Sequence, residues 1–203
     1  MHQARRALLA AAGLSLALSA CNQQRTNVAN DSDGKTPAAA PATDHSDPVA
    51  SAMAAAPEAV ARSAAVIASN PDGTMRRLRE GTNGFTCMPD NPATPGPDPM
   101  CLDANALRWV EAMLARKPPP PDAVGMAYML AGGTDASNTD PYATKPTEGN
   151  NWIQTGPHLM IFGSKEMLAG HPANPKPDTS APYVMWANTP YAHLMVPVGS
   201  ERS

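Results

Sequence analysis

The sequence predicts a single α+β domain over residues 51–203, with a mainly antiparallel sheet, one principal helix and long proline-rich loops. Three observations support this class. Proline makes up 20 of the 153 residues after Ala50, which argues against a helical bundle. Turn signals separate short apolar runs, as they do in hairpins. Only residues 103–116 show a clear run of apolar residues at helical spacing.

The first part of the domain is expected to form a hairpin. Residues 64–68 are a short apolar run, and the strong turn signal Asn70-Pro71-Asp72-Gly73 follows them. The chain should therefore return as a strand at 74–79. Before this hairpin, residues 57–63 are expected to form a short helix with proline at its first position.

The principal helix has recognisable ends. Asp103 is a good N-cap, and Arg116 and Lys117 place positive charge at the C-terminal end, where the helix dipole favours it. Four prolines at 118–121 then stop the helix. Residues 123–131 follow as a strand that is apolar on both faces.

The remaining elements are mostly strands. We expect them at 152–162, 183–187 and 191–198, with a one- or two-turn helix at 164–168. A polar stretch at 132–151 precedes them.

The N-terminus has the layout of a secretory signal. His2, Arg5 and Arg6 precede a mostly apolar run at 7–20, and no carboxylate occurs before Asp31. Residues 1–20 are therefore predicted to be a signal peptide. The apolar run is too short to span a bilayer comfortably.

The end of this run, Leu18-Ser19-Ala20-Cys21, resembles the signal of bacterial lipoproteins. The resemblance implies that Cys21 is acylated, becomes the new N-terminus and anchors the protein to a membrane of the cell envelope. Because Asn22 follows rather than aspartate, it implies the outer membrane. The alternative is an ordinary cleaved signal in which Cys21 has no special role.

Residues 21–50 are expected to be the lipidated cysteine and a disordered linker, because they hold almost no large apolar side chain. Without the first twenty residues, 13 basic and 18 acidic residues remain, which gives a formal charge of −5. This negative charge argues against nucleic acid as a partner.

Assigning Cys21 to lipid leaves Cys87 and Cys101 as a pair. In an oxidising compartment a disulfide is the expected outcome. Five prolines lie between the two cysteines, so the bridge would close a loop that can be neither helix nor central strand. The alternative is a pair of thiolate metal ligands flanked by Met88 and Met100.

Two segments near the C-terminus both contain His-Leu-Met. On strands, His158 and Met160 would point to one face, and His193 and Met195 would likewise share a face. If the leucine side packs on the helix, two imidazoles and two thioethers share the opposite face. This soft ligand set suits copper, especially Cu(I), and Met185 is a further candidate ligand. The alternative is ordinary core packing by methionine and histidine.

The polar stretch 132–151 is a second candidate site, because long loops are often functional. Asp135, Asn138 and Asp140 would supply oxygen ligands to a small ligand or to calcium. The glycine and terminal glutamate of an EF-hand loop are missing, and capped turns explain the same residues.

Four segments together resemble blocks of an uncharacterised family of exported bacterial proteins, and this resemblance covers most of residues 64–198. The resemblance implies that these residues form one domain, but it implies no particular activity or cofactor. The blocks are residues 81–84, 137–141, 157–160 and 189–195.

The sequence therefore predicts a lipid-anchored envelope protein with a non-enzymatic domain that binds a small ligand, a soft metal being the most specific version. No familiar catalytic motif is present. One alternative is an envelope hydrolase that uses His158 or His193. Another is a structural or assembly role.

Overall fold

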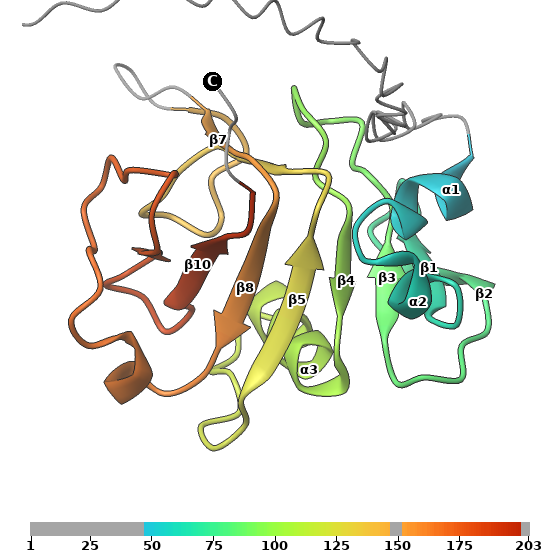
Figure 1. Ribbon diagram of the computed structural model, residues 1–203, viewed down its shortest axis with the longest axis horizontal. Coiled ribbons are helices and arrows are strands. Elements are labelled where there is room, and N and C mark those ends of the chain that lie inside the picture. The colour runs from blue at the N-terminus through green and yellow to red at the C-terminus, as the bar shows by residue number, and fades with distance from the viewer. Residues whose placement is uncertain (1–46, 147–151, 200–203) are drawn as a thin grey trace, which may run out of the picture. The chain divides into compact units, whose positions relative to one another are not determined.

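The computed structural model describes residues 47–146 and 152–199 (Figure 1). Cys21, the predicted signal peptide and most of the predicted linker lie outside the described residues. Eight strands form one sheet in the order β2-β1-β3-β4-β5-β8-β10-β9, and β6 pairs with β7 separately. The strands are β1 Ala65–Ser69, β2 Met75–Arg79, β3 Thr86–Met88, β4 Met100–Leu102, β5 Gly125–Met129, β6 Gly133–Asp135, β7 Ile153–Thr155, β8 His158–Phe162, β9 Tyr183–Met185 and β10 His193–Pro197.

The described part of the fold is mostly sheet, and mainly antiparallel as predicted, but its short helices do not make it a clear α+β arrangement with one principal helix. The large sheet is mixed: β1 and β3 pair in parallel, and its other ladders are antiparallel. The helices are short and number three among these residues. They are α1 Pro48–Met53, α2 Glu58–Ala61 and α3 Ala104–Leu114, with a 3-10 turn, η1, at Lys165–Leu168.

The N-terminal hairpin is confirmed. β1 and β2 pair antiparallel, and Ser69 lies opposite Met75 next to the turn. Asp72 stabilises the turn by accepting hydrogen bonds from the backbone nitrogen and the hydroxyl of Thr74. Gly73 adopts a φ of 81°, a conformation that glycine reaches at low cost.

α1 was not predicted, and it begins inside the segment expected to be disordered. Asp47 caps it by accepting a hydrogen bond of 2.8 Å from the backbone nitrogen of Val49. Ser51 and Ala52 are buried, because their small side chains let the helix approach the sheet closely. The ordered domain therefore starts a few residues before the expected boundary at residue 51.

The predicted disulfide joins two central strands. Cys87 on β3 lies directly opposite Cys101 on β4, and their sulfur atoms are 2.02 Å apart. The prolines between them stay outside the ladder, as expected from proline's missing N–H. Met88 and Met100, however, extend the two strands by one residue each.

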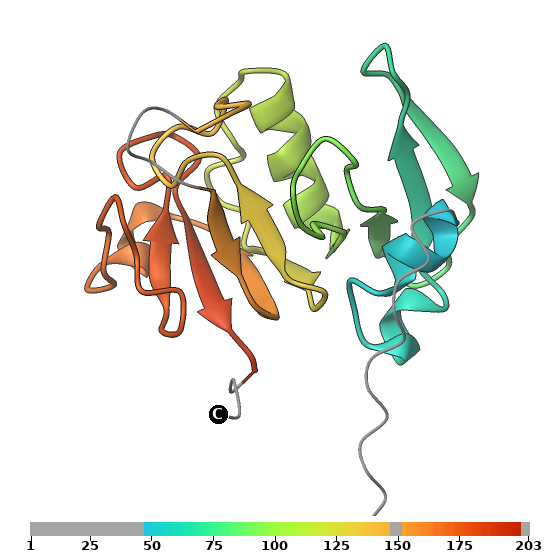
Figure 2. The same ribbon diagram turned by 90° about the horizontal axis from the view of Figure 1, so that it is seen from above.

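The two faces of the sheet support separate cores. α1 and α2 lie on one face near β1 and β3, whereas α3 lies on the other (Figure 2). Cys101 belongs to the first core and its neighbour Leu102 to the second, as the alternation of a strand requires. Asp103 caps α3 as predicted, because its Oδ1 accepts a hydrogen bond of 2.7 Å from the nitrogen of Ala106.

The single strand expected at 152–162 is two strands in different sheets. β7 pairs with β6, and β8 joins the large sheet between β5 and β10. Gly156 and Pro157 separate them, which is consistent with proline's inability to donate to a ladder. The strands expected at 183–187 and 191–198 are confirmed as the shorter β9 and β10.

Candidate functional site

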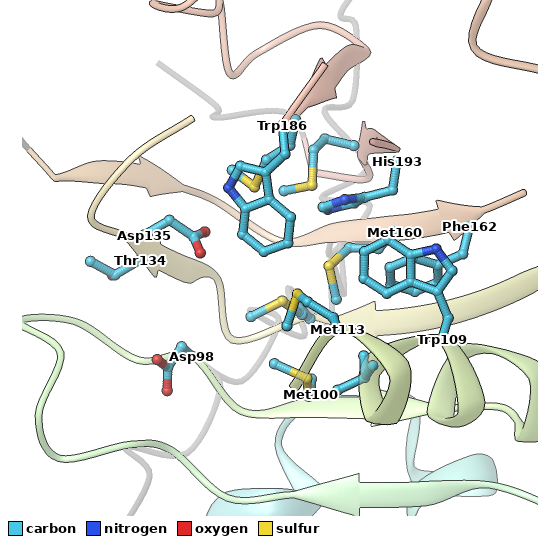
Figure 3. Close-up of a pocket in the computed structure, with 14 residues that line it drawn as sticks. Asp98, Met100, Trp109, Met113, Thr134, Asp135, Met160, Phe162, Trp186 and His193 are labelled. Carbon is cyan, nitrogen blue, oxygen red and sulfur yellow. The ribbon is translucent and has the colours of Figure 1, made fainter. Parts of the chain in front are cut away.

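A cavity of about 100 Å³ lies between α3 and the sheet face that it covers (Figure 3). Its most unusual feature is sulfur, because half of the chain's 12 methionines line it. They come from α3 and from five strands of the large sheet. These methionines are Met100, Met113, Met129, Met160, Met185 and Met195.

The register of β8, β9 and β10 places four of the candidate ligands in one patch. Met160 lies directly opposite Met195, and Met185 lies directly opposite His193. Directly opposed residues of an antiparallel pair point to the same face, with Cβ atoms about 5 Å apart. His193 and Met195 are two positions apart on β10 and so share that face as well.

The two His-Leu-Met segments are therefore neighbouring strands, but the histidine side, not the leucine side, faces α3. His193 and Met160 are buried, whereas Leu159 and Leu194 on the opposite face are half-buried. The arrangement encloses the imidazole and thioethers under the helix. The sequence analysis expected the leucines to pack against the helix and the ligands to share the opposite face. In the structure the ligand face packs against the helix instead.

His193 is 1% exposed, and only one of its two ring nitrogens has a hydrogen-bond partner among the described residues. Its Nδ1 donates a hydrogen bond of 3.0 Å to the carbonyl of Tyr191, which fixes the tautomer because a carbonyl only accepts. Nε2 therefore carries a lone pair, and it has no hydrogen-bond partner among the described residues. Burial lowers the pKa of His193 to about 4, so the ring is neutral at physiological pH.

His158 is held in the same way at a different place. Its Nδ1 donates a hydrogen bond of 2.8 Å to the carbonyl of Gly156, and its buried Nε2 also lacks a partner within the described ranges. However, His158 lies opposite Pro197, which is four residues from His193 on β10. The backbone positions of the two histidines are therefore offset by about 13 Å along the strand direction. His158 does not line the cavity, so only three of the four predicted metal ligands meet there.

Aromatic rings form the walls beside His193. The ring centroids of Trp186, Phe162 and Trp109 lie 5.0, 5.2 and 5.5 Å from the imidazole. Trp186 has a φ of 54°, which is costly for a residue with a large side chain. Its indole nitrogen holds it there by donating a 2.9 Å hydrogen bond to the carbonyl of Ser137.

Two carboxylates lie at the opposite end of the cavity from His193 (Figure 3). Burial, and secondarily the charge of Asp98, raises the pKa of Asp135 to about 7. Burial also raises the pKa of Asp98 to about 6. Asp98 accepts hydrogen bonds from the nitrogen of Asn91 and the hydroxyl of Thr94. Asp135 accepts none from the residues that the structure describes.

The predicted ligand loop does not converge on one point. Asp135 lines the cavity, whereas Asn138 is buried elsewhere and donates to the carbonyl of Asn174. Asp140 is exposed, and its carboxylate accepts a hydrogen bond from the nitrogen of Tyr142, as in a capped turn. In the described ranges, no group of three or more His, Cys, Asp or Glu side chains is arranged to hold a metal ion.

Sequence reasoning missed Asp98, Met100, Met113 and the two tryptophans of the cavity. Asp98 lies at the end of the proline-rich loop and Met100 begins β4, and nothing in the local pattern connects either residue with the His-Leu-Met segments. They reach the cavity because β4 pairs with β5. Trp109 and Met113 lie four positions apart on α3, a spacing that signals a shared helix face but not what that face covers.

Comparison with known proteins gives no further lead, because no family model, curated protein or solved structure matches the chain. No helix within the described residues has the length and apolar character needed to cross a membrane. The functional argument therefore depends on the cavity itself.

Proposed function

We propose that this is a lipid-anchored protein of the bacterial envelope whose domain binds a small ligand in the methionine-lined cavity. The observation that carries the proposal is the Nε2 of His193, which is buried on the cavity wall and has no hydrogen-bond partner in the part of the chain that the structure describes. Leaving a buried polar atom without a hydrogen bond costs about 1–3 kcal/mol. A ligand that contacts this nitrogen would offset that cost.

The other residues of the cavity wall also favour a binding site over an ordinary core that methionine side chains fill. Protein interiors are close-packed, and methionine is well suited to filling irregular gaps. Here six methionines surround a space of about 100 Å³ that they leave open. The half-buried Asp135 also lines this space and accepts no hydrogen bond from the described residues, so its carboxyl group is a second polar group that a ligand could contact.

The anchor is part of the proposal. It is supported by the signal layout at 1–20, by Leu18-Ser19-Ala20-Cys21, and by the Cys87–Cys101 disulfide, a bond typical of extracytoplasmic proteins. In this proposal Cys21 carries the lipid, and the chain between Cys21 and α1 tethers the domain to the outer membrane. Radiolabelled palmitate fed to the host should label the protein but not Cys21→Ala; label retained by that variant would contradict lipidation at this residue.

The binding site is tested by blocking the cavity. Met113 is half-buried on α3, so Met113→Trp is expected to fill the cavity without disturbing the sheet, and exposed Leu114→Trp adds a similar bulk outside it. Native mass spectrometry of protein purified from its own envelope should show a small bound mass in wild type and Leu114→Trp but not in Met113→Trp. A bare polypeptide mass in all three would overturn the proposal, as would retention by Met113→Trp.

The hydrolase alternative gains no support from the geometry. A histidine base needs a hydroxyl or carboxylate within hydrogen-bond distance. In the described residues both Nδ1 atoms, those of His158 and His193, bond backbone carbonyls, and both Nε2 atoms have no partner. We therefore do not propose hydrolysis, and no observation favours an assembly role.

A further inference from the structure

We infer that the ligand of this cavity is a soft monovalent metal ion, Cu(I), bound by the imidazole of His193 and by thioethers that include Met160 and Met195. The inference rests on the proposed function, because it assigns an occupant to the same cavity. It differs from the sequence prediction by excluding His158 and by placing the site under α3.

The nitrogen ligand is already prepared. Metal-binding histidines typically donate one ring N–H to a backbone carbonyl or carboxylate, which orients the other nitrogen toward the ion. The Nδ1 hydrogen bond from His193 to the Tyr191 carbonyl has this form, and Nε2 is free among the described residues.

The sulfur ligands are fixed by strand register. Met185 and Met195 are, respectively, the cross-strand neighbour and the i+2 neighbour of His193, and Met160 lies opposite Met195. All four side chains are buried on the face beneath α3. Methionine has three rotatable side-chain bonds, so thioethers that start about 5 Å apart at Cβ can close around one ion.

The chemistry selects a soft ion of low charge. Thioethers and imidazole suit Cu(I), whereas carboxylate, carbonyl and water ligands suit calcium and magnesium. Neutral ligands leave the charge of the ion uncompensated, so a single positive charge costs less to bury than two. Asp98 and Asp135 lie at the other end of the same cavity, and the negative charge that they carry when ionised favours a cation there over an anion.

Two indoles of the cavity wall lie close to His193. The ring of Trp186 lies 5.0 Å from that of His193, and the ring of Trp109 lies 5.5 Å from it. A cation close to the face of a tryptophan ring is attracted by the ring quadrupole. The same closeness makes both indoles optical reporters of occupancy.

The experiment titrates the mature, detergent-solubilised protein with Cu(I) under anaerobic conditions, and in parallel with Ag(I), which has the same charge and softness. Tryptophan fluorescence follows binding, and native mass spectrometry counts the ions. Met160→Leu and Met195→Leu remove sulfur while nearly preserving volume, so folding should be retained. The matched control is Met126→Leu, on β5 but outside the cavity.

One ion per wild-type chain is expected, with quenched tryptophan emission. Each cavity variant should bind at least about tenfold more weakly, whereas Met126→Leu should match wild type. Equal affinity in all four proteins would overturn the inference, as would no binding at micromolar metal. In the latter case, an organic mass lost specifically from Met113→Trp would leave the proposed function standing while the metal assignment fails. Protein that carries neither a metal ion nor an organic mass would contradict both the metal assignment and the proposed function.

Discussion

At the scale of single residues, Asp135 makes the folded protein less stable at the pH values at which its side chain ionises. Burial and the charge of Asp98 raise the pKa of Asp135 from the usual 3.8 to about 7. Between these values the folded protein retains a proton that the unfolded chain has lost. The resulting stabilisation is complete below about pH 4 and disappears as the pH rises through 7.

Asp135→Asn should therefore change the pH dependence of folding. At acidic pH the variant and wild type should be equally stable, because both carry a neutral side chain. By pH 8 the variant should be more stable by on the order of 2 kcal/mol, since the asparagine never ionises. Urea unfolding at pH 4, 6 and 8 measures this difference. A similar gain in exposed Asp140→Asn would show that the effect is not specific to the cavity.

The side chains of β8 and β10 show which structural features the alternation of residues along a strand can predict and which it cannot. Alternation was enough to group His158 with Met160 and His193 with Met195. It was not enough to choose which face α3 covers, because Leu159, Ile161 and Leu194 make the other face apolar too. The helix covers the face on which side chains from β5, β8 and β10 together form a core. The choice of face therefore depends on three strands and cannot be read from one strand alone.

At the scale of elements, Asp103 ties α3 to the sheet. One carboxylate oxygen accepts a hydrogen bond from Ala106 at the start of the helix, and the other accepts one of 3.0 Å from the nitrogen of Met126 on β5. The position of α3 fixes Trp109 and Met113 above the cavity. A loss of this cap would therefore affect both stability and the site.

Asp103→Ala should lower the free energy of unfolding by about 2 kcal/mol, because it removes the cap and leaves the nitrogen of Met126 without its acceptor. Equilibrium urea denaturation measures the change. Asp122→Ala, in an exposed turn just before β5, is the matched control and should be close to neutral. Equal losses in the two variants would refute a specific role for Asp103.

Element prediction succeeded where the signal is local. The Asn70–Gly73 turn, the Asp103 cap and the prolines at 118–121 each act within a few residues, and the hairpin and α3 follow from them. The order β4-β5-β8-β10-β9 depends instead on contacts between distant segments. That order brings Asp98 and Met100 to the cavity. The sequence alone could therefore name His193, three of the thioethers and Asp135 as candidates, but not that they share one cavity with Asp98.

At the scale of the whole molecule, the Cys87–Cys101 bridge joins the middle of the large sheet. Cross-linking a loop of this length restricts the unfolded chain and contributes on the order of 3 kcal/mol. The double variant Cys87→Ala, Cys101→Ala should lose about this much stability in urea. Reductant should destabilise wild type similarly and leave the variant unchanged. Two thiols that alkylate in unreduced wild type would contradict the bridge.

The margins of the large sheet have a consequence for aggregation. An open strand edge is a template for polymerisation through backbone hydrogen bonds. One edge, β2, exposes the charged Arg76 and Arg77, and the other, β9, is short and donates from Val184 to the carbonyl of Pro172. Neither border offers a long, uncharged row of free amides, so copies crowded onto one surface should remain separate instead of joining edge to edge into fibrils.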